Sequence, residues 1–162
     1  MLLYNHIHAH KRNILFAGPT GCGKTEIWRV MSRLYPNIRI IDSTMLTMQG
    51  WSGSFKVRDI FSSMSQEEAE KAIIVFDEFD KFCEPLYGSN GTNYGAAAQN
   101  ELLKLIEGGQ IYFPADKGKP ALELDSSGIS FVFCGSFERL TDVKTEPPRP
   151  RGSLPAEGAR RS

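Results

Sequence analysis

One eight-residue stretch decides the fold of this chain: Gly18-Pro19-Thr20-Gly21-Cys22-Gly23-Lys24-Thr25. It follows the apolar residues 14–17 and precedes a segment of helical period, residues 25–34. A glycine-rich loop between a strand and a helix is typical of a phosphate-binding loop, because its backbone N–H groups converge on phosphate oxygens and the helix directs its positive end at the same anion. We expect Lys24 to reach the β- and γ-phosphates and Thr25 to hold Mg²⁺. The alternative is an ordinary glycine-rich turn.

A second motif lies downstream, where an apolar run ends in two carboxylates. Residues 73–76 are all large and apolar, and Asp77 and Glu78 follow them. Such a run predicts a strand buried on both faces of a parallel sheet, and open α/β sheets bind ligands at the carboxyl ends of their strands. We expect Asp77 to orient Mg²⁺ through its water shell and Glu78 to activate the attacking water as general base. An acidic turn is the alternative, but two motifs in this order are far more specific than one.

The remaining elements complete an α/β fold. Apolar periodicity and turn residues predict buried strands at 13–17, 38–42 and 129–134, helices at 24–35, 55–70 and 96–107, and a β-hairpin at 110–113 and 121–124. Ser43 and Thr44 suit a helix cap. Ser136 follows the last strand, where it would touch the γ-phosphate or cap a helix that begins at Phe137. We therefore expect a three-layer P-loop fold with a mostly parallel central sheet.

Composition limits the class of protein. The 162 residues suffice for one core, and 19 basic residues balance 19 acidic ones, so net charge favours neither nucleic acid nor an anionic membrane as partner. Three scattered cysteines argue against a zinc site or disulfide framework, and no apolar stretch reaches 18 residues, so we expect a cytoplasmic protein. Residues 145–162 are rich in proline and arginine without apolar periodicity, which predicts a disordered tail after one domain at 1–144.

A tryptophan between two glycines is the third notable feature, in Gly50-Trp51-Ser52-Gly53. Flanking glycines favour a mobile loop with an exposed ring, whereas the alternative is a tryptophan folded back onto its own domain. Composition alone does not separate these two interpretations.

Taken together, the motifs resemble those of the AAA+ ATPases. Within that family they are similar to the ClpX-type protein unfoldases of the Clp group, with HslU as a close cousin. The resemblance covers residues 3–140 and is carried by five stretches, at 13–25 (Walker A), 44–53 (pore loop), 76–81 (Walker B), 99–108 and 133–137 (sensor 1).

The resemblance implies an ATP- and Mg²⁺-dependent subunit of a homo-hexameric ring that unfolds and translocates protein substrates, with a ClpP-like peptidase as a further partner. It places Trp51 where the family has a substrate-gripping tyrosine, so the exposed interpretation of that ring is favoured. It implies no nucleic-acid or membrane partner.

The same resemblance implies an incomplete large subdomain. The family's arginine finger, fifth sheet strand and small helical domain have no counterpart in the sequence. Because an arginine finger stabilises the transition state, we expect weak or no hydrolysis by this chain alone. Two other classes stay open, a nucleotide-regulated scaffold module and a DNA-directed AAA+ motor.

Overall fold

The computed structural model describes residues 11–47, 55–85, 87, 93–116 and 118–138. Within these residues the central sheet has four strands, β1 (Asn13–Ala17), β2 (Ile38–Asp42), β5 (Ile73–Asp77) and β8 (Ser130–Gly135). Their spatial order is β1-β8-β5-β2, and every pairing between them is parallel. The predicted α/β class with a mostly parallel sheet is therefore confirmed.

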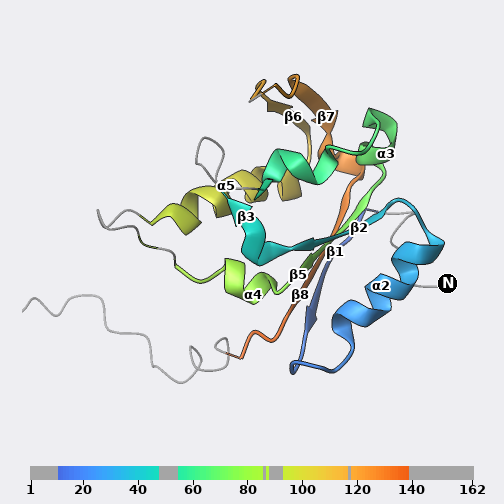
Figure 1. Ribbon diagram of the computed structural model, residues 1–162, viewed down its shortest axis with the longest axis vertical. Coiled ribbons are helices and arrows are strands. Elements are labelled where there is room, and N and C mark those ends of the chain that lie inside the picture. Colours follow the sequence, from blue (N-terminus) through green and yellow to red (C-terminus); the bar gives the residue numbers. More distant parts are fainter. Residues whose placement is uncertain (1–10, 48–54, 86, 88–92, 117, 139–162) are drawn as a thin grey trace, which may run out of the picture.

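Helices cover both faces of this sheet, which confirms the predicted three layers. Figure 1 shows α2 (Lys24–Leu34) on one side of the strands and α4 (Phe79–Phe82) and α5 (Tyr94–Glu107) on the other. Successive residues of β5 point to opposite faces, so Ile73 and Val75 pack with Trp28 of α2 while Ile74 and Phe76 join the opposite cluster. This alternation explains why the whole apolar run of β5 is buried.

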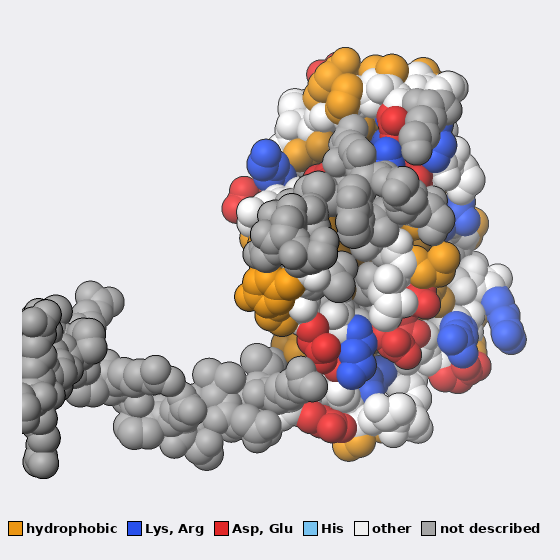
Figure 2. Space-filling model, turned by 60° about the vertical axis from the view of Figure 1, so that its left-hand side comes forward, with side chains coloured by type: hydrophobic (Ala, Val, Ile, Leu, Met, Phe, Trp, Pro, Cys, Tyr) orange, Lys and Arg blue, Asp and Glu red, His pale blue; other side chains and the backbone are white. Residues whose placement is uncertain are grey.

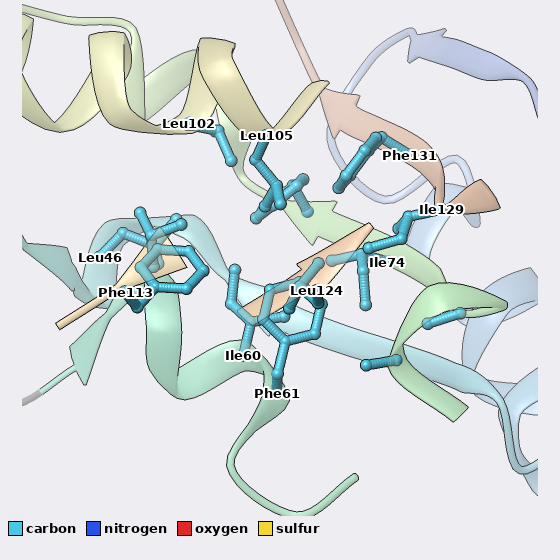
Figure 3. Packing of buried hydrophobic residues seen from close by; sticks show 14 of the residues in the cluster. Leu46, Ile60, Phe61, Ile74, Leu102, Leu105, Phe113, Leu124, Ile129 and Phe131 are labelled. Carbon is cyan, nitrogen blue, oxygen red and sulfur yellow. The ribbon is translucent and has the colours of Figure 1, made fainter. Parts of the chain in front are cut away.

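The larger core cluster lies between the sheet and α5. Figure 3 shows Leu102 and Leu105 of α5 directed at Ile74 and Phe131 of the sheet. Phe76 stacks between its neighbours, with ring centroids 6.2 Å from Phe131 and 5.6 Å from Phe133. Phe76 and Phe133 are direct neighbours in the pairing of β5 with β8, so their rings pack the carboxyl halves of the two strands together beside the candidate site.

The expectation of a buried first strand is wrong for β1. Its residues alternate between exposed and half-buried, and the side chain of Leu15 is 55% exposed. Among the described residues β1 pairs with β8 alone, so it forms an edge of the sheet. An apolar run cannot by itself distinguish an edge strand from a central one.

The single helix expected at 55–70 is also wrong. The segment begins as a short strand, β4 (Phe55–Lys56), paired in parallel with β3 (Leu46–Thr47). A 3-10 turn η2 (Val57–Phe61) and a short helix α3 (Gln66–Glu70) follow. The polar side chains of this segment bond its own backbone, because Asp59 accepts the N–H of Lys56 at 3.1 Å and Ser65 caps α3. Such local bonds compete with a continuous helix.

The cap expected at Ser43 and Thr44 is shifted by one residue. Asp42 accepts the backbone N–H of Thr44 at 3.0 Å and starts a 3-10 turn, η1 (Ser43–Met45), that leads into β3 rather than into an α-helix.

The helix at 24–35 is found as α2, and the helix at 96–107 begins two residues early as α5, because Asn93 accepts the N–H of Ala96. The Trp51 loop and the tail lie outside the described residues.

The predicted hairpin is confirmed as β6 (Gln110–Phe113) and β7 (Leu122–Asp125), paired antiparallel. Its tip is tied to β4 and η2 by charged side chains, of which Lys56, Arg58 and Asp59 are buried. Lys56 pairs with Asp116, and Asp59 accepts from Lys119 at 2.6 Å. Arg58, only 5% exposed, donates to the carbonyls of both Pro114 and Pro120, one on each side of the tip.

Arg58→Met is expected to lower the free energy of unfolding by about 2–4 kcal/mol, because the carbonyls of Pro114 and Pro120 both lose the charged donor that the buried Arg58 supplies. Methionine keeps the aliphatic stem, so the loss reports the hydrogen bonds. Urea denaturation measures it. The matched control is Arg29→Met, which removes an arginine 58% exposed in a 3.7 Å pair with Glu26 and should change stability by about 0.5 kcal/mol or less. Equal losses in the two variants would contradict the assignment.

Candidate functional site

The glycine-rich loop lies between β1 and α2, at the carboxyl edge of the sheet. Gly21 and Gly23 have φ of +80° and +89°, the left-handed region that side chains other than glycine's avoid. The N–H of Gly18 reaches the carbonyl of Gly135 at 3.3 Å, so the start of the loop is fixed to the end of β8. The loop therefore has the curled backbone that its sequence predicts.

Lys24 is folded back onto this loop. Its Nζ donates to the carbonyl oxygens of Gly18 at 2.6 Å and Pro19 at 2.8 Å. Two backbone oxygens thus hold a full positive charge beside the loop's own N–H groups. This arrangement concentrates positive potential where an anion would bind.

The two sequence motifs meet at one hydrogen bond. The hydroxyl of Thr25, in the first turn of α2, donates to Asp77 Oδ1 at the end of β5, with 2.6 Å between the oxygens. The two residues are 52 positions apart in the chain. The strand that ends in carboxylates and the helix that follows the loop are therefore parts of one site.

A cavity of about 570 Å³ opens at this point. The predicted residues that line it are Thr20, Gly21, Gly23, Lys24, Thr25, Asp77, Glu78 and Ser136. Gly18, Pro19 and Cys22 belong to the same loop but are not among the lining residues. Acidic and basic side chains are mixed on the lower part of the face in Figure 2, rather than separated into areas of one charge.

Glu78 has an unusual backbone. Its φ is +51°, it caps α4, and its N–H donates to Asp77 Oδ1 at 3.0 Å. A left-handed glutamate is strained, and such strain is found mainly at functional positions. Its side chain is exposed and borders the cavity, so it has access to a water molecule there. Its role as general base stays a prediction.

Ser136 borders the cavity but donates its proton elsewhere. Its Oγ bonds Asp80 Oδ2 at 2.7 Å. The alternative that Ser136 caps a helix beginning at Phe137 is wrong, because Phe137 has a φ of +51°. The contact of Ser136 with a γ-phosphate stays a prediction.

Asp80 is one of the cavity-lining residues that sequence reasoning missed. It belongs to the same acidic run as Asp77 and Glu78, which was the available signal. Burial opposes ionisation of Asp80, but hydrogen bonds from Ser136 and from the backbone N–H groups of Phe137 and Asp80 outweigh it and hold the pKa of its carboxyl below the usual range. Asp80 is therefore an acceptor at neutral pH.

The cysteines near the site differ in environment. Cys22 is exposed, with its Sγ 3.7 Å from Lys24 Nζ. Cys134 is buried in β8, and burial, aided by the charge of Asp77, raises the pKa of its thiol to about 11. The thiol of Cys134 therefore stays protonated, and inert as a nucleophile, at neutral pH.

The donors at the site fit a hard cation bound together with phosphates. Mg²⁺ is usually held by one or two protein oxygens plus phosphates and water, and Thr25 and Asp77 offer two adjacent oxygens. Over the part of the chain that the structure describes, no three histidine, cysteine or acidic residues cluster as ligands for a metal. In those same residues no helix has the length and apolar character to cross a membrane.

Comparison with known proteins identifies the family. A family model described as "ATPase family associated with various cellular activities (AAA)" matches residues 14–139. The chain belongs to the AAA family of ATPases. The match includes the glycine-rich loop, α2, β5 and β8, so the cavity lies wholly within the AAA region.

Within the AAA family the chain is ClpX-like. It is 31% identical over 148 residues to "ATP-dependent Clp protease ATP-binding subunit ClpX" of Porphyromonas gingivalis, which covers 83% of this chain and 36% of that protein. It is 30% identical over 158 residues to ClpX 2 of Wolinella succinogenes, covering 88% of this chain and 39% of that protein. The predicted resemblance is confirmed, and the AAA chain spans well under half the length of these relatives.

Proposed function

We propose that this chain binds and hydrolyses ATP as a subunit of a ClpX-like homo-hexameric ring that unfolds and translocates proteins in the cytoplasm. The hydrogen bond between Thr25 and Asp77 is the observation that carries the proposal. It joins the loop suited to phosphates to the strand end suited to a cation and a base. The similarity to ClpX proteins supports the same function.

The residues divide the work by their chemistry. The loop N–H groups and Lys24 bind the phosphates, and Thr25 and Asp77 would hold Mg²⁺. When bound, that ion neutralises phosphate charge. Glu78 accepts a proton from the attacking water as the new oxygen–phosphorus bond forms and the bond to the ADP oxygen breaks. We place these residues in one nucleotide-binding subdomain at 1–144, with a tail at 145–162.

The mechanical part of the proposal concerns residues 50–53, outside the described region. The strands on either side of it pair in parallel, with Leu46 opposite Phe55 and Thr47 opposite Lys56. Both ends of the intervening segment are therefore anchored side by side. We propose that Trp51 grips the substrate chain through its large aromatic surface, and that a ClpP-like peptidase receives the product in the assembled protein.

Trp51→Ala is expected to spare ATP hydrolysis and to abolish unfolding of a folded, tagged protein substrate. The reason is that the variant removes the gripping ring and leaves the cavity intact. Hydrolysis and loss of substrate fluorescence are measured on the assembled protein.

Trp51→Tyr is the matched control, because it keeps an aromatic ring, and it should unfold the substrate. Unfolding at the normal rate by Trp51→Ala would reject the gripping role. Stimulation of hydrolysis by DNA rather than by unfolded protein would instead favour a DNA-directed motor.

A further inference from the structure

The chain leaves each of two neighbouring strands, β5 and β8, through a residue in the left-handed conformation, and we call these two segments the exits of β5 and β8. Glu78 follows β5 and Phe137 follows β8 within two residues, and each has a φ of +51°. Strained residues of this kind persist only where the surrounding contacts force them. In the part of the chain that the structure describes, Asp80 makes the hydrogen bonds that join the two exits.

Asp80 is the second residue of α4, and its side chain reaches Ser136 just after β8, 56 positions away in the chain. Its Oδ2 accepts the hydroxyl of Ser136 at 2.7 Å, and its carboxylate also accepts the backbone N–H of Phe137. One carboxylate therefore bonds both residues of the β8 exit.

The packing at this contact is tight enough to need a glycine. A methyl group at Gly135 would lie 2.6 Å from Asp80 Oδ1 and 2.7 Å from the ring of Phe137. Separations of that size are closer than atoms can approach, so the carboxylate is held against the backbone of β8. The Asp80 carboxylate therefore packs directly on the strand end that precedes Ser136.

This geometry decides what Ser136 can offer to the cavity. A serine hydroxyl has one proton and two lone pairs, and here the proton is donated to Asp80. Asp80 and Ser136 both line the cavity. Because its proton is used, the Ser136 hydroxyl can offer only lone pairs to a group in that cavity. It is arranged to accept a hydrogen bond, whereas a direct contact with phosphate oxygens would require it to donate one.

We propose that Asp80 is a positioning residue that keeps Ser136 as an acceptor for the attacking water beside Glu78. The inference rests on the proposed ATP hydrolysis. The water oxygen bonds the γ-phosphorus, the bond to the ADP oxygen breaks, one water proton passes to Glu78, and the other O–H stays intact and donates to Ser136. Asp80 itself touches neither water nor phosphate.

The test uses Asp80→Ala, Ser136→Ala and their double variant in the assembled protein. Each single variant should lower kcat for ATP about tenfold and change KM less than about threefold, because orientation is lost and binding is kept. Since Asp80 acts through Ser136, the double variant should be no slower than the slower single one. Ser136→Thr, which retains a hydroxyl, should restore most of kcat.

Three outcomes would overturn the inference. Multiplying losses in the double variant would mean that the two residues act independently. A raised KM with unchanged kcat in Ser136→Ala would mean that Ser136 binds phosphate directly. If the wild type turned over ATP normally and Asp80→Ala had the same kcat, Asp80 would have no part in the reaction, but the proposed function would stand. If the wild type did not hydrolyse ATP at all, both the inference and the proposed function would be rejected.

Hydrogen exchange, measured without ATP, distinguishes a local effect of the Asp80 variants from misfolding of the whole domain. Hydrogen exchange at the Phe137 amide should accelerate at least tenfold in Asp80→Ala, because its acceptor is gone, while the amides of β5 stay protected. Asp80→Asn, a smaller change, serves if the alanine variant is unstable. Unchanged exchange at Phe137 in both variants would show that the bond does not hold the β8 exit, and the inference would fail.

Discussion

ATP binding is expected to weaken at least about 100-fold when Lys24 is replaced by alanine. The Nζ of Lys24 is fixed by the carbonyls of Gly18 and Pro19, so its charge is positioned before any phosphate arrives. A charge-assisted hydrogen bond contributes roughly 1.5–3 kcal/mol, and contacts with two phosphate groups together correspond to two or more powers of ten in affinity. Calorimetric titration with ATP, with and without Mg²⁺, measures the change.

The control for net charge is Lys71→Ala. Lys71 is also a lysine, 63% exposed, and its partner is Glu67 in α3, outside the cavity. We expect its loss to change ATP affinity less than about threefold. Retention of ATP affinity in Lys24→Ala, with the normal fold by circular dichroism, would show that the glycine-rich loop is a structural turn.

Glu78→Gln is expected to reduce ATP hydrolysis by a factor of about 100 or more while ATP still binds. Glutamine has nearly the same shape but cannot accept the water proton, so only the chemical step is affected. Single-turnover hydrolysis and equilibrium binding, measured on the assembled protein, separate the two effects.

Glu138→Gln is the matched control, because Glu138 lines the same cavity and the variant removes the same charge. Its hydrolysis should remain within about threefold of normal. If Glu78→Gln turned over ATP as fast as the wild type, the scaffold interpretation would be favoured, since ATP would then organise the protein without Glu78 as base.

The parts of the site that could be predicted are those with local signals. The curled loop requires glycine at Gly21 and Gly23, and β5 requires apolar residues on both faces, so each can be recognised from its own few residues. Their meeting through Thr25 and Asp77 followed from the rule that parallel strands place their carboxyl ends at one edge.

The features that escaped prediction depend on partners far away in the chain. Arg58 looks like a surface residue of a helix until the carbonyls of Pro114 and Pro120 are brought to it. The hydrogen bond between Asp80 and Ser136 likewise joins residues 56 positions apart in the chain, so no local pattern indicates it. Local periodicity contains no information about such contacts, so the single helix expected at 55–70 was wrong and the bond between Ser136 and Asp80 was not foreseen.

The central position of β8 in the sheet affects how the chain folds during its synthesis. β8 is the last strand of the described sheet to be synthesised, yet it lies between β1 and β5, which have no pairing with each other. Until residue 135 has left the ribosome, β1 lacks the one partner it has among the described strands, and Phe76 lacks the rings of Phe131 and Phe133. A nascent chain that stops short would expose apolar strand edges, so the sheet should close in a single late step and require protection from aggregation before it.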